Sequence, residues 1–263
     1  MTNTKPLAVV TGASSGIGFE LAKVFADHGY DLLVNAEDNG LEAAAEQLRA
    51  AGAHVQPVQT DLSTYDGVEE LYSAIASTGR PVSAAALNAG VGQGGAFIDT
   101  DLADEIRVID LNITSTVHLA KRLLKDMVSR DAGRVLVTSS IASTMPGSFQ
   151  AIYNASKSFL QSFTQALGDE LKDTGVTITA LMPGPTDTNF FHRADMDDTK
   201  IGRGSKDDPA LVAKQGYEAL MGDKNKVIAG SATTKAQGVA GKLLPDNLKA
   251  AAHRQMAQPE SGE

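Results

Sequence analysis

Tyr153 and Lys157 are the residues whose types and spacing most clearly suggest chemistry. The segment from Tyr153 to Lys157 reads YNASK, so on a helix the two side chains share one face and the ammonium lies near the phenol. A free phenol has a pKa of about 10. One ammonium at about 4 Å supplies about 4 kcal/mol toward the ionised form at an effective dielectric near 20. The pair predicts a tyrosine that transfers protons near neutral pH, and a plain surface Tyr–Lys pair is the alternative.

Two other polar positions are candidates for the same site. Ser139 and Ser140 follow Arg134 to Thr138, a segment rich in Val and Leu that is typical of a buried strand. The carboxyl ends of strands are where open α/β sheets bind their ligands, so either serine can face a substrate. Asn112 lies between two helical segments, and from its local sequence alone it is a helix-kink or capping residue.

A glycine-rich turn is the second chemical feature. Residues 11–18 read TGASSGIG, between an apolar run at 7–10 and an amphipathic run at 17–27. A pyrophosphate requires close approach of backbone, which glycine allows, and a helix N-terminus offers free N–H groups to it. The turn alone is weak evidence, because a simple strand-to-helix turn also uses glycine. Its position between a strand and a helix favours a dinucleotide site.

Several motifs in this order resemble the short-chain dehydrogenase/reductase family over about residues 6 to 188. They are the TGxxxGxG turn, Asp61-Leu62, the segment Leu87 to Gly90, YxxxK, and Pro183-Gly184 with Thr188. Leu87 departs from the family, which usually has Asn there. The resemblance implies a nicotinamide dinucleotide site built from Gly12, Ser14, Ser15, Gly16, Ile17, Gly18, Glu37, Asp61, Leu62, Asn88, Ala89, Gly90, Tyr153, Lys157, Pro183, Gly184, Thr186 and Thr188.

The resemblance also implies an activity and its catalytic residues. It implies hydride transfer between the dinucleotide and a carbonyl or secondary alcohol substrate, with Tyr153 as general acid or base beside Lys157. Ser140 would hydrogen-bond the substrate oxygen, and it is preferred to Ser139 because it precedes Tyr153 by the family's separation. Asn112 would hold a water chain to Lys157.

The residues after the second expected strand favour NAD, although NADP is possible. NADP-preferring relatives usually carry a basic residue just past this strand or just before Gly16, and here those places hold Glu37 and Ser15. A carboxylate near the adenosine ribose repels a 2′-phosphate and can accept a hydrogen bond from a 2′-hydroxyl. Against this, Ala36 occupies the place where NAD-specific relatives usually have Asp.

The elements that position these residues alternate between apolar runs and amphipathic runs. This alternation predicts one α/β domain over residues 1–263, a Rossmann-type doubly wound parallel sheet with helices on both faces. We expect strands at 7–10, 31–35, 53–58, 84–87, 134–139, 176–182 and 227–229, and helices at 17–27, 41–51, 68–75, 101–110, 112–130, 152–171 and 209–221.

Residues 189–208 are expected to form a mobile lid, and residues 258–263 a frayed tail. His192 and Arg193 on the lid are the candidates for anchoring an anionic substrate, because residues 91–97 and 141–149 contain no Arg or Lys. By position, the remaining substrate wall is mostly apolar. It is expected to include Val91, Gln93, Ile141, Met145, Phe149, Met182, Phe190 and Phe191.

Composition excludes several classes of function. The chain of 263 residues has a net charge of -9, which disfavours binding to nucleic acid. It has no Cys, so it lacks a thiolate metal site and a cysteine nucleophile, and we expect no bound metal. No segment reads as a signal peptide or a membrane span, and we expect a cytoplasmic protein without membrane contact.

Two alternatives to the oxidoreductase remain. A non-catalytic dinucleotide sensor on the same scaffold would keep the glycine-rich turn and lose the Ser, Tyr and Lys, all of which this chain has. An epimerase or dehydratase would usually have a larger C-terminal substrate domain. The expected partners are a small alcohol or ketone and further copies of the chain, since relatives usually form dimers or tetramers through the helices at 112–130 and 152–171.

Overall fold

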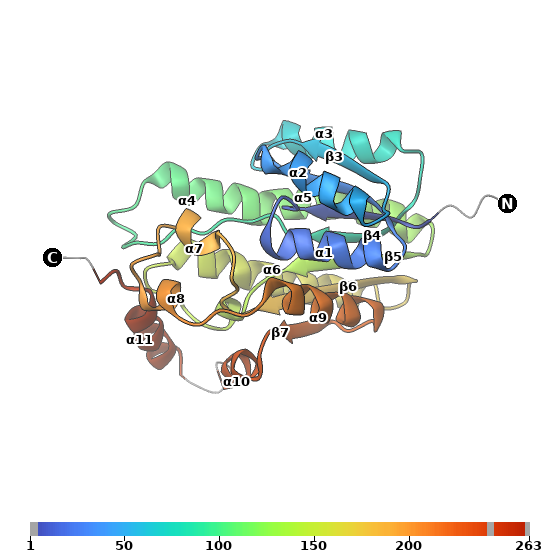
Figure 1. The fold of residues 1–263 in the computed structure, drawn as a ribbon. Helices are drawn as coiled ribbons and strands as arrows, with labels where there is room; N and C mark the ends of the chain where they lie inside the picture. Colours follow the sequence, from blue (N-terminus) through green and yellow to red (C-terminus); the bar gives the residue numbers. More distant parts are fainter. Residues whose placement is uncertain (1–4, 241–244, 261–263) are drawn as a thin grey trace.

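The computed structural model describes residues 5–240 and 245–260. Over these residues, seven parallel strands form one sheet in the order β3-β2-β1-β4-β5-β6-β7 (Figure 1). This order confirms the predicted Rossmann-type fold. The strands are β1 (Leu7–Thr11), β2 (Asp31–Ala36), β3 (Val55–Gln59), β4 (Val82–Leu87), β5 (Gly133–Thr138), β6 (Val176–Pro183) and β7 (Lys226–Ala229).

Three helices cover one face of the sheet. Phe25 of α1, Leu48 of α2 and Leu220 of α9 are buried together against the side chains of Ala8 and Val10 of β1. These helices bury one apolar stripe each, which is why the 3.6-residue periodicity predicts them. Asp208 caps α9 by accepting a hydrogen bond from the backbone N–H of Ala210 at 2.8 Å. The bounds are α1 (Gly16–Asp27), α2 (Gly40–Ala50) and α9 (Pro209–Met221).

The opposite face is covered by α3, α5 and α6. Leu71 of α3, Leu123 of α5 and Leu160 of α6 pack against Leu7 and Val9, which point away from Ala8 and Val10 because side chains alternate along a strand. Both faces of the sheet are therefore buried, as its nearly continuous apolar strands require. The bounds are α3 (Tyr65–Ser77), α5 (Ser115–Ser129) and α6 (Ala151–Glu170).

The direction in which successive strands are added to the sheet reverses between β1 and β4, while all strands stay parallel. After β3 the chain returns past β1 to start β4, so the first turn and the end of β4 lie side by side at the carboxyl edge. Such a switch point leaves a crevice outside the strand ends, where open α/β sheets bind ligands.

The two helical stretches expected at 101–110 and 112–130 are joined in the structure. Helix α4 (Leu102–Ile109) continues through a π-helical segment, Asp110–Thr114, directly into α5. A π segment inserts an extra residue into the helix, and such segments are frequent at functional sites. Asn112 lies within it.

The C-terminal part contains two helices that sequence periodicity does not predict, α10 (Ala232–Ala240) and α11 (Asp246–Ala257). The expected lid contains two short helices, α7 (Phe190–Arg193) and α8 (Lys200–Arg203), and Figure 1 shows α11 beside α8. The mobility of the lid stays a prediction. In the expected tail, Glu260 pairs with Arg203 at 2.7 Å, and residues 261–263 lie outside the described residues.

None of the described helices has the length and apolar character that crossing a membrane requires.

Candidate active site

The glycine-rich turn lies against the end of β4. Gly12 has φ +66° and Gly16 has φ +58°, in the left-handed region that glycine adopts without strain. A Cβ built on Gly18 would lie 2.0 Å from Gly12 O and 2.6 Å from Asn88 Nδ2, so no other residue fits there without movement of the backbone. The side chain of Asn88 donates to Thr11 O at 3.2 Å and fixes the turn to β4.

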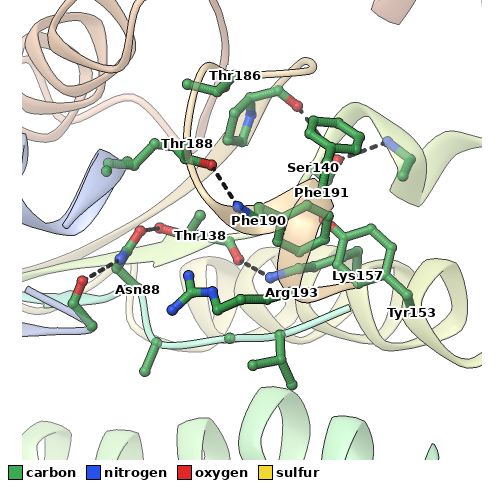
Figure 2. Close-up of a pocket in the computed structure, with 18 of the residues that line it drawn as sticks. Asn88, Thr138, Ser140, Tyr153, Lys157, Thr186, Thr188, Phe190, Phe191 and Arg193 are labelled. Atoms are coloured by element: carbon green, nitrogen blue, oxygen red, sulfur yellow. Dashed lines mark hydrogen bonds between the residues drawn. The ribbon is translucent and has the colours of Figure 1, made fainter. Parts of the chain in front are cut away.

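One pocket brings together most of the predicted site. All the predicted site residues except Gly18 and Asn112 line it. Figure 2 shows Asn88, Ser140 and Tyr153 among them. Gly18 packs closely against Gly12 and Asn88 without lining the pocket, and Asn112 is fully buried. The predicted residues that line the pocket are Gly12, Ser14, Ser15, Gly16, Ile17, Glu37, Asp61, Leu62, Asn88, Ala89, Gly90, Ser140, Tyr153, Lys157, Pro183, Gly184, Thr186 and Thr188.

One end of the pocket is acidic, and a cation from a distant helix reaches it. Arg107 of α4 pairs with Glu37, which is 70 residues away in sequence, and its Nη1 lies 3.4 Å from Asp61 Oδ2. Burial acts to raise the pKa of Asp61, but hydrogen bonds from Ser63 and the nearby guanidinium together hold it below its usual range. Asp38 accepts a hydrogen bond from Ser14 Oγ at 2.6 Å.

The two serines after β5 have different surroundings. Ser139 Oγ donates to Lys157 O at 2.9 Å and so fastens β5 to α6. Both serines line the pocket, but the Ser140 hydroxyl makes a longer bond, donating to Pro183 O at 3.4 Å. It also accepts from the backbone N–H of Ala142 at 3.1 Å. Of the two, Ser140 is therefore the serine placed to meet a ligand beside Tyr153.

Tyr153 and Lys157 lie on the same face of α6, as their spacing predicts (Figure 2). The Lys157 ammonium donates to Thr138 O at 3.0 Å and lies 5.7 Å from the centre of the Tyr153 ring. Burial raises the pKa of Tyr153 to about 12, against an opposing hydrogen bond from Ser140. Burial lowers the pKa of Lys157 to about 8. The pKa of the phenol is therefore raised and not lowered as expected, because burial outweighs the hydrogen bond from Ser140.

Asn112 connects three parts of the site floor. Its Oδ1 accepts from the backbone N–H of Val91 at 2.9 Å, and its Nδ2 donates to Val91 O at 2.9 Å and to Ser156 Oγ at 3.0 Å. A Cβ on Gly90 would lie 3.0 Å from Asn112 Oδ1 and 3.4 Å from Lys157 Nζ. Asn112 thus fixes the segment after β4 to α6 next to the lysine, and its water-holding role stays a prediction.

Comparison with known proteins places this geometry in a family. The family model for short chain dehydrogenases matches residues 6–199. The chain belongs to the short-chain dehydrogenase/reductase family. It is therefore an oxidoreductase that uses NAD or NADP.

Individual members of the family support this assignment. The chain is 33% identical over 189 residues to the uncharacterized oxidoreductase YmfI of Bacillus subtilis, covering 71% of this chain and 77% of that protein. The fold superposes on a short-chain dehydrogenase/reductase from Burkholderia phymatum in complex with NAD, with a TM-score of 0.83, 25% identity and 100% of both chains. A Sphingobium yanoikuyae short-chain dehydrogenase in complex with NADPH gives 0.81, with 26% identity over 98% of each chain.

The segment after β6 is held by a buried carboxylate. The backbone N–H of Asp207 donates to Pro185 O at 2.8 Å, and Asp207 O accepts from the N–H of Asp187 at 2.9 Å. The Asp207 carboxylate accepts from Thr234 Oγ1 at 2.5 Å and from the N–H of Ser231 at 3.0 Å. This network fixes the segment that contains Gly184, Thr186 and Thr188 against α10. The sequence predicts neither the helix nor the network.

The substrate side of the pocket differs from the expected wall. Val91, Ile141, Met145, Phe190, Phe191 and Arg193 line the pocket as expected, and His192 instead pairs with Asp197 on the surface. Gln93, Phe149 and Met182 do not line it, since Met182 is in the core, Gln93 donates to Gly94 O, and the Phe149 ring packs under Arg254.

Helix α11 supplies the part of the wall that sequence reasoning missed. Its residues Lys249, Ala252, His253 and Met256 line the same pocket as Tyr153 and Lys157 of α6. Ala257 is buried with Phe191, Ala194 and Met196 of the lid, which joins the helix to the lid segment. Residues 249–257 read KAAAHRQMA, which has no apolar stripe that would indicate a buried face.

Proposed function

We propose that this protein is an NAD-preferring oxidoreductase that interconverts ketones and secondary alcohols, with Tyr153 as the group that transfers the proton. The observation that carries this proposal is a shared cavity. Tyr153, Ser140 and Lys157 line the same pocket as the glycine-rich turn. A sensor without chemistry would not need a phenol, a serine hydroxyl and an ammonium lining one pocket at the carboxyl edge of the sheet.

The residues of the turn fit a dinucleotide. Gly12 and Gly16 expose backbone where side chains would fill the cradle, and the N-terminus of α1 points its free N–H groups at this space. Asp61 and Leu62 would hold the adenine side, and Gly184, Thr186 and Thr188 the nicotinamide side. When bound, the dinucleotide supplies or accepts the hydride.

The protein residues handle the proton. With a pKa of about 12, Tyr153 is protonated at neutral pH and can donate its proton to a carbonyl oxygen. The Ser140 hydroxyl, which lines the same pocket, can hydrogen-bond that oxygen and so keep the carbonyl in reach. Lys157 is held by Thr138 O and places a positive charge beneath the phenol, which favours the phenolate that remains after transfer.

A panel of ketones and alcohols tests this function. Purified protein should oxidise NADH in the presence of at least one ketone and reduce NAD with the matching alcohol, followed by NADH absorbance. Tight binding of NADH without turnover of any compound in the panel would contradict the proposal and favour the non-catalytic sensor.

The acidic end of the pocket supports NAD as the preferred cofactor. Glu37, Asp38 and Asp61 line this end, and Arg107, the one guanidinium among the described residues that pairs with them, already contacts two of the carboxylates. A 2′-phosphate would approach these carboxylates without a free cation to neutralise it. The Glu37 carboxylate should thus be the main barrier to NADPH.

We expect Glu37→Gln to reduce the preference for NADH over NADPH by about fivefold, the effect of about 1 kcal/mol of charge repulsion near a protein surface. The variant removes one carboxylate and releases Arg107. The measurement is kcat/KM for both cofactors with one ketone. Glu42→Gln is the matched control, because Glu42 pairs with Arg49 on α2 outside the pocket. A wild-type enzyme that prefers NADPH would contradict the assignment.

We also propose that the protein assembles as a homodimer or homotetramer through α5 and α6. Phe159 of α6 and Val128 of α5 remain 41% and 39% exposed, and Phe159 stacks on Phe163 of the same helix. Aromatic side chains enriched on an exposed helix face are typical of an interface.

The double variant Phe159→Glu with Val128→Glu should shift the protein to a smaller assembly, because burying two carboxylates in an apolar interface costs several kcal/mol. Light scattering after size-exclusion chromatography measures the mass. Leu211→Glu is the control, since Leu211 is 38% exposed on α9 at the other face of the sheet. A monomeric wild-type protein would refute the proposal.

A further inference from the structure

Helix α11 is fastened to the loop that leads into the catalytic helix. Ser148 Oγ donates to Ala250 O at 3.2 Å, and the Arg254 guanidinium lies 5.4 Å from the centre of the Phe149 ring. Phe149 has φ +64°, a left-handed conformation that is uncommon for a large side chain. The loop is therefore held in an unusual backbone conformation directly before α6. Helix α11, which contacts this loop, also lines the pocket.

His253 is the buried polar side chain of that wall. It is 3% exposed, it lines the pocket, and its Nδ1 lies 2.9 Å from Ser148 O. A carbonyl oxygen can only accept, so Nδ1 carries the hydrogen in this bond. Burial lowers the pKa of His253, which keeps the ring neutral at pH 7. In a neutral ring with hydrogen on Nδ1, Nε2 holds a lone pair and can only accept a hydrogen bond.

Nε2 has no partner among the described residues, and it is not sealed in the core. The hydrogen bonds of His253 in the described part of the chain are limited to the one at Nδ1. Among the described residues, the side-chain polar atoms that are fully enclosed and lack a hydrogen bond belong to Glu105, Arg134, Asn154, Gln161 and Thr177. Nε2 of His253 is not one of them, so it is not fully enclosed. Nε2 therefore keeps some exposed surface, on a residue that lines the pocket.

A second unpaired polar side chain lies close in the chain. Gln150 is 4% exposed, it lines the same pocket, and it comes two residues after Ser148, the partner of His253. An amide can donate where the imidazole accepts. The neighbouring lining residues Met145, Ala252 and Met256 are apolar, and Lys249 on the same helix pairs with Asp246 at 3.1 Å.

We propose that His253 is a specificity-determining residue, whose Nε2 accepts a hydrogen bond from a hydroxyl or N–H group that the substrate carries away from its reactive carbon. The substrate class is then a ketone or secondary alcohol with an apolar body and a second, neutral hydrogen-bond donor. A hydroxyl fits best, because it can donate to His253 and accept from Gln150. This inference rests on the proposed oxidoreductase function and adds the substrate class to it.

The test uses methyl ketones of graded chain length, each with and without a terminal hydroxyl. For the wild-type enzyme, kcat/KM at one chain length should favour the hydroxy ketone over its parent by about fivefold or more, the effect of one buried hydrogen bond. The parent ketones report on hydride transfer separately. If no ketone of either kind is turned over, the proposed function fails; if both kinds are turned over equally at every length, only the inference fails.

Two substitutions separate recognition from support of the loop. In His253→Asn, Nδ2 takes the place of Nδ1 and can still donate to Ser148 O, but no atom reaches the Nε2 position. In His253→Gln, Oε1 reaches the Nε2 position as an acceptor. We expect His253→Asn to bring the hydroxy-to-parent ratio close to one and His253→Gln to keep most of it.

If His253→Asn kept the hydroxy-to-parent ratio and His253→Gln lost it, His253 would have a purely structural role and the proposal would be overturned. Turnover of the parent ketones should stay within about threefold of wild type in both variants, since neither change touches the reacting atoms. Loss of parent turnover in both would also overturn it, by placing His253 in the support of the catalytic helix. Leu248→Met, on the same helix but exposed and outside the pocket lining, is the matched control and should leave the ratio unchanged.

Discussion

Tyr153→Phe should lower kcat by at least about a hundredfold, while the affinity for NADH changes by less than about threefold. The substitution removes the proton that the phenol donates and keeps the ring. That ring packs 5.1 Å from the ring of Phe190, centre to centre, so the lid and the wall of the pocket should keep their positions. The proton would then have to come from water, and the aromatic ring that remains at this position limits the access of water to the substrate oxygen.

The measurement is single-ketone turnover together with a fluorescence titration of NADH. Tyr72→Phe is a suitable control, because Tyr72 lies on α3 under the Arg122 guanidinium and away from the pocket. It should leave both quantities unchanged. Turnover of Tyr153→Phe near the wild-type value would contradict the assignment of Tyr153, and would leave the glycine-rich turn as the basis for nucleotide binding alone.

Gly18→Ala should weaken NADH binding by about tenfold or more and lower the free energy of unfolding by about 1–3 kcal/mol. The new methyl group would meet Gly12 O at 2.0 Å and Asn88 Nδ2 at 2.6 Å. Neither atom can move freely, since one is backbone of the turn and the other holds the turn to β4. The first helix and the turn would separate, and the backbone cradle would lose its shape.

Urea unfolding and NADH titration measure the two effects. Gly168→Ala is the matched control: its added Cβ would lie 3.5 Å from Ile178 Cγ2, an ordinary contact, and alanine favours a helix over glycine by about 1 kcal/mol. It should be neutral or slightly stabilising, with unchanged NADH affinity. Equal behaviour of the two variants would show that the close approach at Gly18 does not shape the site.

The fold was accessible from the sequence because its signals are local. Val9 and Val10 belong to a continuous apolar run, and a strand covered on both faces needs such a run. Leu21 and Phe25 repeat at helical spacing and are both buried. Tyr153 and Lys157 were found for the same reason, since four residues on a helix define one face.

The features that sequence reasoning missed depend on contacts between distant segments. Arg107 meets Glu37 across 70 positions, and no local pattern indicates that pairing. Helix α11 buries only His253 and Ala257, so its docking depends on these two residues meeting the loop before α6 and the lid. The direction of the Tyr153 pKa depends on burial, which spacing does not reveal.

The division of the pocket between two parts of the chain has a practical consequence for protein engineering. The match to the family ends at residue 199, whereas part of the pocket wall comes from Asp246–Ala257. Libraries restricted to the pocket-facing positions of that one helix can therefore be screened for new substrates with the proton-transfer machinery left intact.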